Sequence, residues 1–353
     1  MMTIDETLNL LRPNIAKLQP YSSARQEFFG NVAVLLDANE NPYTLYDEIP
    51  EINRYPDPLQ RTVKAKIASL KGISANQIFL GNGSDEAVDL IIRCFCEPAK
   101  DSIAIFAPTY GMYSVCAAIN NVSVKEFYLD DNYKIDVNDF FDNLSPEIKV
   151  VFICSPNNPT GNAQSIEAIE QILSQFKGIV VVDEAYINFC PEKSTIDFLE
   201  TYPNLIILQT FSKAWGMTGA RIGLALAHKN IIEILNKVKF PYNIGIPALK
   251  VLEEALEKGS WSSNIINQII AERERLKSEI ERLPFVLKVF PSDSNFILVK
   301  TTNADSIYRY LLNNMIVVRN RSREPLCENC LRITVGKPEE NAKLIEIFKS
   351  FQP

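Results

Sequence analysis

The chain has 353 residues, of which 46% are hydrophobic and 22% are charged, and its formal net charge is −7. These proportions are typical of a globular protein that is long enough to bury a large core and to divide into two lobes. The negative charge argues against a nucleic-acid-binding surface, and no apolar run approaches the ~20 residues of a membrane span. The first residues do not resemble a signal peptide, so we expect a cytoplasmic protein.

The cysteine and histidine content narrows the possible chemistry. Seven cysteines are scattered along the chain without the spacing of a disulfide framework, which fits reduced thiols. Cys327 and Cys330 are spaced as in half a zinc site, but there is no second such pair, and the only histidine, His228, lies far away. We therefore expect no metal site and no Ser-His-Asp triad. Any catalysis must depend on lysine, aspartate, tyrosine or a cofactor.

The first two thirds of the sequence predict an arm followed by an α/β domain. We expect residues 1–41 to form an N-terminal arm and part of a small domain, and residues 42–240 to form a large domain. Apolar runs without period-two alternation are typical of strands buried on both faces, and helical patterns such as 84–96 and 165–175 lie between them. This order predicts a mostly parallel sheet between helices. The expected strands are Ile78–Leu80, Ile103–Phe106, Val150–Cys154, Ile179–Val182, Leu205–Leu208 and Ile222–Ala227.

Beyond Pro241 the pattern changes, and we expect residues 241–353 to form a smaller α+β domain. A long amphipathic stretch, 261–283, carries apolar residues at near-helical spacing. The expected elements that follow are strands at Val286–Phe290 and Asn295–Val299, a helix at Ala304–Asn313, strands at Ile316–Arg319 and Leu331–Val335, and a closing helix.

Polar residues that could bind a ligand or take part in catalysis follow several of the predicted strands. In an open parallel sheet, ligands bind outside the carboxyl ends of the strands. A glycine-rich turn at 81–84 opens a helix and could hold a phosphate on free N–H groups, although Ser84 or Asp85 could equally be an ordinary helix cap. Tyr110 could stack on a planar ring or pack in the core. Asn158 offers an amide in a turn, and the carboxylate of Asp183 at a buried strand end needs a cationic partner.

The segment 210–223 is the most informative one, because it places Lys213 directly after the apolar run 205–208. A lysine at a buried strand end is unfavourable unless its charge is offset, and a covalent bond to a cofactor is one solution. Thr210, Ser212 and Arg221 offer hydroxyls and a guanidinium to a phosphate. A turn whose lysine simply reaches water remains possible from this segment alone.

Taken together, the segments 158–161, 183–186 and 212–221 resemble, in order and roughly in spacing, the motifs of the fold-type I aminotransferases that use pyridoxal 5'-phosphate. The resemblance covers essentially the whole chain, and it implies a large domain with a mostly parallel seven-stranded sheet between helices. It also implies catalytic roles for Lys213, Asp183 and Tyr186. The cofactor-binding residues implied are Lys213, Ser84, Asp85, Tyr110, Asn158, Asp183, Tyr186, Thr210, Ser212, Arg221 and, from a partner subunit, Tyr55.

Within that family the chain is most similar to the histidinol-phosphate aminotransferases. The segments that carry this similarity are 12–13, 18–21, 36–42, 53–56 and 330–336. The similarity implies that substrates are bound by Tyr21, Asn39, Arg319 and Arg332. Arg319 ends the apolar run 316–318, whereas we expect Arg321 and Arg323 on the surface. The turn at 44–46 departs from the family's usual small residues.

The similarity implies a homodimer that exchanges an amino group between histidinol phosphate and 2-oxoglutarate in histidine biosynthesis. Three alternatives remain open from the sequence. An aromatic amino-acid aminotransferase has the same fold, and a flat imidazole and a phenyl ring make similar demands on a pocket. A threonine-phosphate decarboxylase resembles the same subfamily. A cofactor-binding sensor is the non-enzymatic alternative, although the acidic net charge and the absence of a DNA-binding motif disfavour it.

Overall fold

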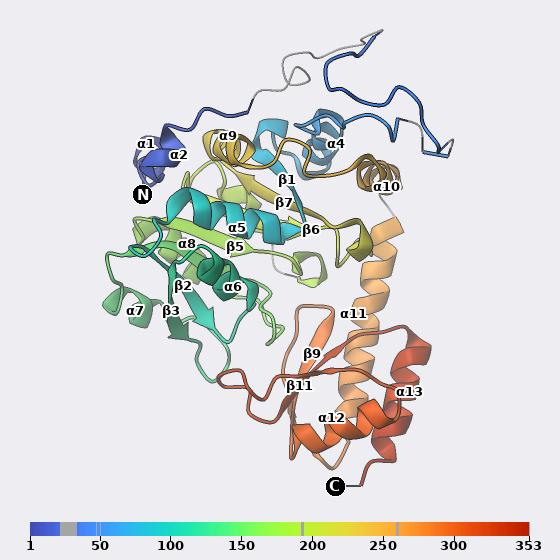
Figure 1. Cartoon of the computed structure of the whole chain (residues 1–353). Coiled ribbons are helices and arrows are strands. Elements are labelled where there is room, and N and C mark those ends of the chain that lie inside the picture. The colour runs from blue at the N-terminus through green and yellow to red at the C-terminus, as the bar shows by residue number, and fades with distance from the viewer. Residues whose placement is uncertain (22–33, 47, 50, 192–193, 259–260, 353) are drawn as a thin grey trace.

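The computed structural model describes residues 1–21, 34–46, 48–49, 51–191, 194–258 and 261–352. A large body contains a seven-stranded sheet between helices, and a smaller body contains a four-stranded sheet with three helices (Figure 1). The two bodies lie next to each other, with the long helix α11 (Trp261–Ile280) leading from the first to the second. This arrangement confirms the predicted α/β fold with a smaller α+β part.

The large sheet has the strand order β1-β7-β6-β5-β4-β2-β3. Adjacent strands from β6 through β3 are parallel, while β7 runs antiparallel to both of its neighbours. The sheet is therefore mostly parallel, as predicted. Its strands are β1 (Ile78–Asn82), β2 (Ser102–Ala107), β3 (Ser123–Tyr128), β4 (Ile148–Cys154), β5 (Ile179–Asp183), β6 (Leu205–Thr210) and β7 (Ile222–Ala227).

The strand β3 is the one that the sequence prediction missed. It lies at the edge of the sheet, and Phe127 is its one buried residue. By contrast, every residue of β5 is buried, with Val180 and Val182 packing on one face and Val181 on the other. A continuous apolar run marks a strand covered on both faces, whereas an edge strand such as β3 carries no such mark.

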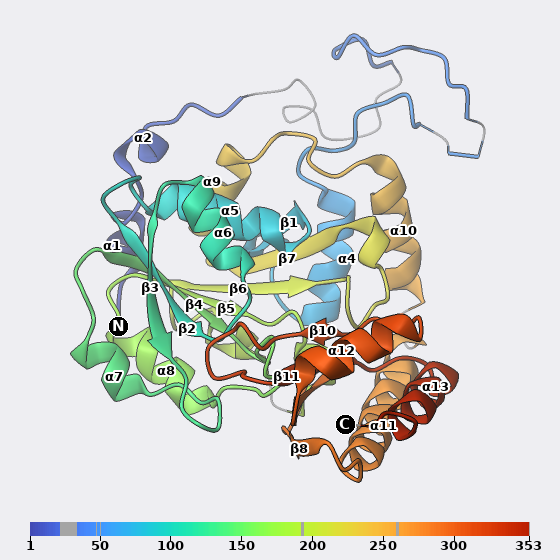
Figure 2. The ribbon, with the colours of Figure 1, turned by 60° about the horizontal axis from the view of Figure 1, so that its bottom comes forward.

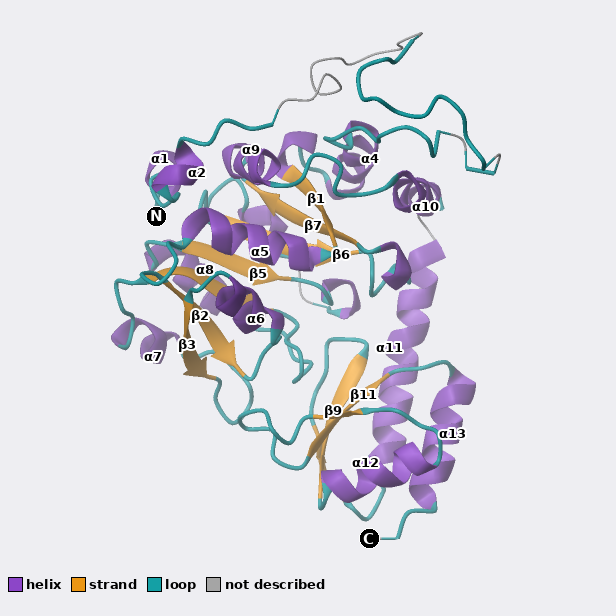
Figure 3. Ribbon diagram, viewed as in Figure 1, coloured by secondary structure: helices purple, strands orange, loops and turns teal. Residues whose placement is uncertain are grey.

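Helices cover both faces of the large sheet, as the purple ribbons around the orange strands show (Figure 3). The side chains of α5, α6 and α9 belong to the core on one face, and those of α4, α8 and α10 to the core on the other. The helices of this body are α1 (Ile4–Leu8), α2 (Pro13–Ala16), α4 (Arg61–Lys71), α5 (Ser84–Phe95), α6 (Met112–Ile119), α7 (Val137–Asp142), α8 (Ile166–Gln175), α9 (Lys229–Val238) and α10 (Ile246–Glu257). Short 3₁₀ helices are η1 (Ala75–Gln77), η2 (Ile187–Phe189), η3 (Thr195–Phe198) and η4 (Thr218–Ala220).

The core of the large body extends beyond the predicted range 42–240. Ile15 in α2 packs into the core under α5, and the N–H of Arg12 donates to the carbonyl oxygen of Cys94 at 2.9 Å. At the other end, Leu252 of α10 is fully buried in the core on the α4 side. Both segments therefore pack on the large sheet, although they lie outside that range in the sequence.

The smaller body has an antiparallel sheet of order β10-β11-β9-β8, with a core of its own. The predicted strand at 316–319 is wrong in its extent, because pairing begins only at Arg319. Met315 takes a left-handed φ of 61°, and Val317 is 77% exposed, so this apolar run is not a buried strand. The elements are β8 (Val286–Val289), β9 (Phe296–Thr301), β10 (Arg319–Asn320), β11 (Cys330–Thr334), α11, α12 (Ala304–Asn313) and α13 (Pro338–Lys349).

Much of the described part of the segment 34–56 stands off the body of the molecule, and two views of the ribbon agree on this (Figures 1 and 2), whereas Tyr55 near its end stacks on Tyr242. Glu40 joins two parts of this segment, because its carboxylate accepts hydrogen bonds from the side chain of Arg54 at 2.8 Å and from the backbone N–H of Tyr55 at 2.6 Å. None of the helices in the described ranges combines the length and the apolar sequence that crossing a bilayer requires.

Candidate active site

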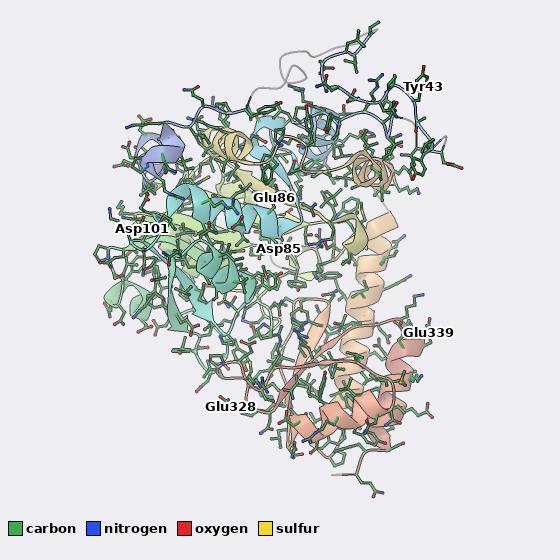
Figure 4. All side chains as sticks on the ribbon, in the orientation of Figure 1. Tyr43, Asp85, Glu86, Asp101, Glu328 and Glu339 are labelled. Atoms are coloured by element: carbon green, nitrogen blue, oxygen red, sulfur yellow. The ribbon has the colours of Figure 1, made fainter. Side chains whose placement is uncertain are left out.

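A cavity of about 420 Å³ lies where the carboxyl ends of the large sheet face the smaller body. The N-terminal turn of α5, which carries Asp85 and Glu86, lies toward this middle region of the molecule (Figure 4). Most of the predicted site residues line the same cavity. Its lining consists of Gly83, Ser84, Asp85, Tyr110, Cys154, Asn158, Asp183, Ala185, Tyr186, Thr210, Ser212, Lys213, Arg221, Arg319, Arg321 and Arg332.

Two glycines shape the start of α5 into an anion-binding cradle. Gly83 has a φ of +76°, and a Cβ built on it would lie 2.6 Å from Nη2 of Arg221. A Cβ on Gly223 of β7 would lie 2.1 Å from the backbone nitrogen of Ser84, so only glycine allows this strand to touch the helix start. The first turn of a 12-residue helix presents free N–H groups and a partial positive charge. A phosphate fits this position, with Arg221 beside it.

Polar contacts around this cradle fix its side chains. Asp85 accepts a hydrogen bond from the hydroxyl of Tyr110 at 3.1 Å and forms a salt bridge with Arg221 at 3.5 Å. The hydroxyl of Thr210 accepts from the N–H of Ser212 at 3.1 Å, which ties the end of β6 to the loop after it. These predicted residues therefore line the same cavity as the start of α5.

Asp183 ends β5 as a buried carboxylate at the bottom of the cavity. Its Oδ2 accepts from the hydroxyl of Tyr113 at 2.6 Å, and its Oδ1 accepts from the N–H of Ala185 at 3.1 Å. Burial raises the pKa of Asp183 to about 6, and these two hydrogen bonds oppose the rise. None of the salt bridges between described residues involves Asp183, so its charge is open to a cationic group of a ligand.

Sequence reasoning missed Tyr113 as a site residue. Its side chain is fully buried, and its ring stacks on that of Phe152 at 4.7 Å, so it reads as an ordinary core residue. Its hydroxyl nevertheless orients Asp183 through a short hydrogen bond. The available signal was its place three residues after Tyr110, in a segment that follows a strand end.

Lys213 reaches into the cavity, and its Nζ lies 5.8 Å from the centre of the ring of Tyr186. Burial lowers its pKa, and the positive charges of Arg332 and Arg221 lower it further. A lysine whose pKa is lowered in this way is a better nucleophile and base at neutral pH. The ring of Tyr186 is itself buried and meets Phe296 edge-on at 5.2 Å, so it is held in place.

The smaller body contributes a wall of arginines to the cavity. Arg332 on β11 is paired in register with Arg319 on β10, and both line the cavity. The guanidinium of Arg332 donates to the side-chain oxygen of Asn158 and lies 5.2 Å from the centre of the Phe296 ring. Burial lowers the pKa of Arg332, and the charges of Arg321 and Arg319 add to this effect.

One expectation about the arginine loop differs from the structure. Arg319 is the more exposed of the two cavity-lining arginines in this loop, whereas Arg321, which we expected on the surface, is partly buried and lines the cavity. The expectation for Arg321 is therefore wrong, and Arg323 is exposed as expected. The sequence could not separate them, because all three lie in one charged stretch.

Three predicted residues are not brought into the cavity within one chain. Tyr21 is 69% exposed, and Asn39 lies exposed in the segment that stands off the body, with a φ of 52°. Tyr55 is 47% exposed, stacks on Tyr242 at 4.3 Å, and lines a different cavity near α4 and α10. Their predicted roles require groups outside the single chain.

Comparison with known proteins gives a consistent result across the whole sequence. Residues 30–348 match the family described as Aminotransferase class I and II. The chain is 47% identical to a protein named histidinol-phosphate aminotransferase from Cytophaga hutchinsonii, with 97% of this chain and 98% of that protein covered. Proteins of the same name from Bacteroides fragilis (47% identical, 100% of both chains) and Christiangramia forsetii (48%, 97% of both) are equally similar.

Solved structures agree with these sequence relatives. The histidinol-phosphate aminotransferase from Clostridium acetobutylicum superposes with a TM-score of 0.78 at 27% identity, covering 85% of this chain and 90% of that one. The enzyme of that name from Sinorhizobium meliloti, solved in complex with pyridoxal-5'-phosphate, gives a TM-score of 0.77 at 23% identity and covers 84% and 83%. At that identity, the second likeness concerns the fold alone.

Proposed function

This chain belongs to the class I and II aminotransferases, and we propose that it transfers the amino group of histidinol phosphate to 2-oxoglutarate. The products are imidazole-acetol phosphate and glutamate, and the reaction is a step of histidine biosynthesis. The relatives that cover the whole chain carry this activity in their names. The observation that carries the proposal is the cavity itself, which joins a phosphate cradle and a lysine on the large body to an arginine wall on the smaller one.

The donor set of the cavity fits pyridoxal 5'-phosphate. The glycine-lined start of α5, with Arg221, suits its phosphate, and the amine of Lys213 suits its aldehyde. The buried carboxylate of Asp183 suits a protonated pyridine nitrogen. When bound, the cofactor supplies an electron sink for the substrate carbon that loses its proton.

The chain's own residues then have separable tasks. Lys213 holds the cofactor, and its amine, with its lowered pKa, moves the proton at the substrate carbon. Asp183 keeps the proton on the ring nitrogen, and Tyr113 orients Asp183. The further proposed contacts are Asn158 and Tyr186 to the ring's phenolic oxygen, Tyr110 stacked on the ring, and Ser84, Asp85, Thr210 and Ser212 around the phosphate.

Substrates are proposed to bind through their anionic groups at the arginine wall. Arg332 is held by Asn158 and Phe296, so its fork has a fixed direction at the cavity. A guanidinium binds a carboxylate and a phosphate through the same pair of N–H groups, so one site serves glutamate and histidinol phosphate in turn. Arg319 assists at the cavity mouth, and Tyr21 and Asn39 complete the substrate site.

Steady-state rates test this substrate assignment. We expect kcat/KM for histidinol phosphate to exceed that for phenylalanine by at least about tenfold, because only the phosphate uses the whole arginine wall. The measurement couples glutamate formation from 2-oxoglutarate to a dehydrogenase, with each amino donor in turn. A preference for phenylalanine would instead assign an aromatic amino-acid aminotransferase. Carbon dioxide release from threonine phosphate would indicate a decarboxylase, and failure to react with glutamate would indicate a sensor.

The active form is proposed to be a homodimer in which Tyr55 reaches the partner's cofactor phosphate. The segment 34–46 supports this, because it stands off the body while exposing large apolar side chains that water solvates poorly. These exposed side chains are Val34 (66%), Leu36 (92%), Tyr43 (79%), Leu45 (95%) and Tyr46 (56%).

Sedimentation equilibrium tests the dimer directly. We expect a mass of about twice the chain's 39.9 kDa at micromolar concentration. A variant with Leu36→Asp and Leu45→Asp should shift toward the monomer and bind the cofactor more weakly, because Tyr55 would lose its site in the partner. A monomeric wild-type protein with full activity would exclude this part of the proposal. We place the enzyme in the cytoplasm, in keeping with its seven free cysteines.

A further inference from the structure

Arg321 is a cavity residue whose guanidinium is only partly satisfied. Its backbone N–H donates to the carbonyl oxygen of Cys330 at 2.8 Å, which continues the β10–β11 pairing and fixes where the side chain begins. Its Nη1 donates to a carboxylate oxygen of Glu324 at 3.2 Å. Its Nε is buried, and no hydrogen-bond acceptor is present for it among the described residues.

The guanidinium of Arg321 has one nitrogen left for an external ligand. Glu324 occupies Nη1, and Nε is enclosed by protein atoms, so Nη2 is the donor that an external acceptor can reach. A guanidinium N–H binds a phosphate or carboxylate oxygen through a charge-assisted hydrogen bond. Arg321 therefore presents a cationic donor at the wall of the substrate cavity.

The charges around the cavity indicate what this donor would bind. Arg221 has Asp85 as its partner and Arg321 has Glu324, whereas none of the salt bridges between described residues involves Arg319 or Arg332, which lie beside Arg321 on the smaller body. The mutual repulsion of these three arginines contributes to the lowered pKa of Arg332. A carboxylate brings one negative charge and fills one fork. A phosphate monoester brings about 1.5 to 2 negative charges and three acceptor oxygens, enough for more than one guanidinium.

We propose that Arg321 is a specificity-determining residue that selects substrates carrying a phosphate dianion over substrates carrying only a carboxylate. Its Nη2 binds a phosphate oxygen that Arg332 and Arg319 leave free, and glutamate makes no use of it. This inference rests on the proposed function, since it names which substrate of the same site gains from the third arginine.

The test compares Arg321→Gln with Arg323→Gln in the cofactor-loaded enzyme. Arg323 lies two residues away in the same charged loop but is exposed and does not line the cavity, so it is a matched control. For Arg321→Gln we expect KM for histidinol phosphate to rise about 10- to 100-fold, with KM for glutamate changing less than about threefold. Arg323→Gln should leave both values within about twofold of the wild type.

The pH dependence separates charge selection from a general loosening of the site. The second ionisation of a phosphate monoester has a pKa of about 6, so the wild-type kcat/KM for histidinol phosphate should rise through that pH as the dianion forms. In Arg321→Gln the rise should become shallower, because the variant distinguishes less between the monoanion and the dianion. Equal losses with histidinol phosphate and glutamate, or no loss with either, would overturn the inference.

A second measurement keeps the inference testable if the proposed substrate is wrong. Glycerol phosphate carries the phosphate but no amine, and it should inhibit the glutamate half-reaction competitively. We expect its inhibition constant to rise at least about tenfold in Arg321→Gln, with that of acetate unchanged. If the wild type does not react with histidinol phosphate but Arg321→Gln weakens inhibition by glycerol phosphate, the proposed substrate is refuted and the role of Arg321 is supported. Unchanged inhibition would refute that role alone.

Discussion

Lys213→Ala is expected to lower turnover by at least about 10³-fold while the protein stays folded and retains some cofactor. The variant removes the amine that we propose to hold the cofactor and to move the proton, and both tasks would contribute to the rate. The side chain is only partly buried, and no hydrogen bond of its Nζ to a described residue is present, so its loss leaves no buried group unsatisfied. The cradle at α5 and the carboxylate of Asp183 remain to bind the cofactor without the covalent bond.

The measurement mixes the purified variant with glutamate and follows the cofactor absorption in a single turnover. Cofactor content after dialysis and the thermal unfolding temperature report binding and folding separately from activity. Lys71→Ala is a suitable control, because burial also lowers the pKa of Lys71, yet this lysine bonds to Gln209 and does not line the cavity. Turnover of Lys213→Ala above about a tenth of the wild-type rate would refute the assignment of the lysine.

That most of the proposed cofactor-binding residues share one cavity could be predicted from the sequence, because each of them lies in a short segment that follows a strand. Residues that follow different parallel strands lie at the same edge of the sheet, whatever the details of packing. Asp183 and Lys213 are therefore expected near each other although they belong to separate segments of the sequence. The structure places both in a single cavity. What the sequence could not supply was the side of the strand on which each residue lies.

The pair Asp183 and Glu184 illustrates this limit. Asp183 is the last residue of β5 and Glu184 follows it directly, and successive side chains along an extended chain point to opposite sides. Asp183 lines the cavity, whereas Glu184 is buried away from it, where it accepts from the N–H of Thr195 at 2.6 Å and from Gln209 at 2.8 Å. Only the family resemblance, not the pattern of residues, indicated Asp183 rather than Glu184 as the carboxylate expected to take part in catalysis.

The arginine wall was harder to predict because it depends on pairing in the smaller sheet. Arg319 and Arg332 are cross-strand partners that lie 13 positions apart in the sequence. Arg321 comes two residues after Arg319, which is the spacing at which side chains of a strand return to the same face. A charged loop in the sequence gives no sign of that register. Tyr21, Asn39 and Tyr55 were beyond any such argument, since the single chain leaves all three outside the cavity.

Asp183→Asn is expected to lower turnover by about 10²-fold or more and to weaken cofactor binding. Asparagine keeps the shape of the side chain and can still accept from Tyr113, so packing changes little. It lacks the charge that keeps a proton on the pyridine nitrogen. The loss of activity should therefore exceed any loss of stability, as judged by thermal unfolding of the cofactor-free protein.

The pH dependence of cofactor binding identifies Asp183 as the responsible group. Burial raises its pKa from 3.8 to about 6, so in the folded, cofactor-free protein the carboxyl group keeps its proton up to a higher pH than in the unfolded chain. The stability that this protonation contributes is complete below pH 3.8 and is lost as the pH rises through 6. A cationic ring prefers the ionised carboxylate, so cofactor affinity should fall as the pH drops below about 6.

Two variants make the assignment strict. In Asp183→Asn this part of the pH dependence should vanish, whereas the contribution of the cofactor's own phosphate should remain in both proteins. Tyr113→Phe removes the donor that stabilises the ionised carboxylate, so the pKa of Asp183 should rise and the midpoint should move to higher pH. Adding cofactor to the cofactor-free proteins at a series of pH values, with binding followed by fluorescence, gives these midpoints. A midpoint unchanged in both variants would mean that a group other than Asp183 carries the charge beneath the ring.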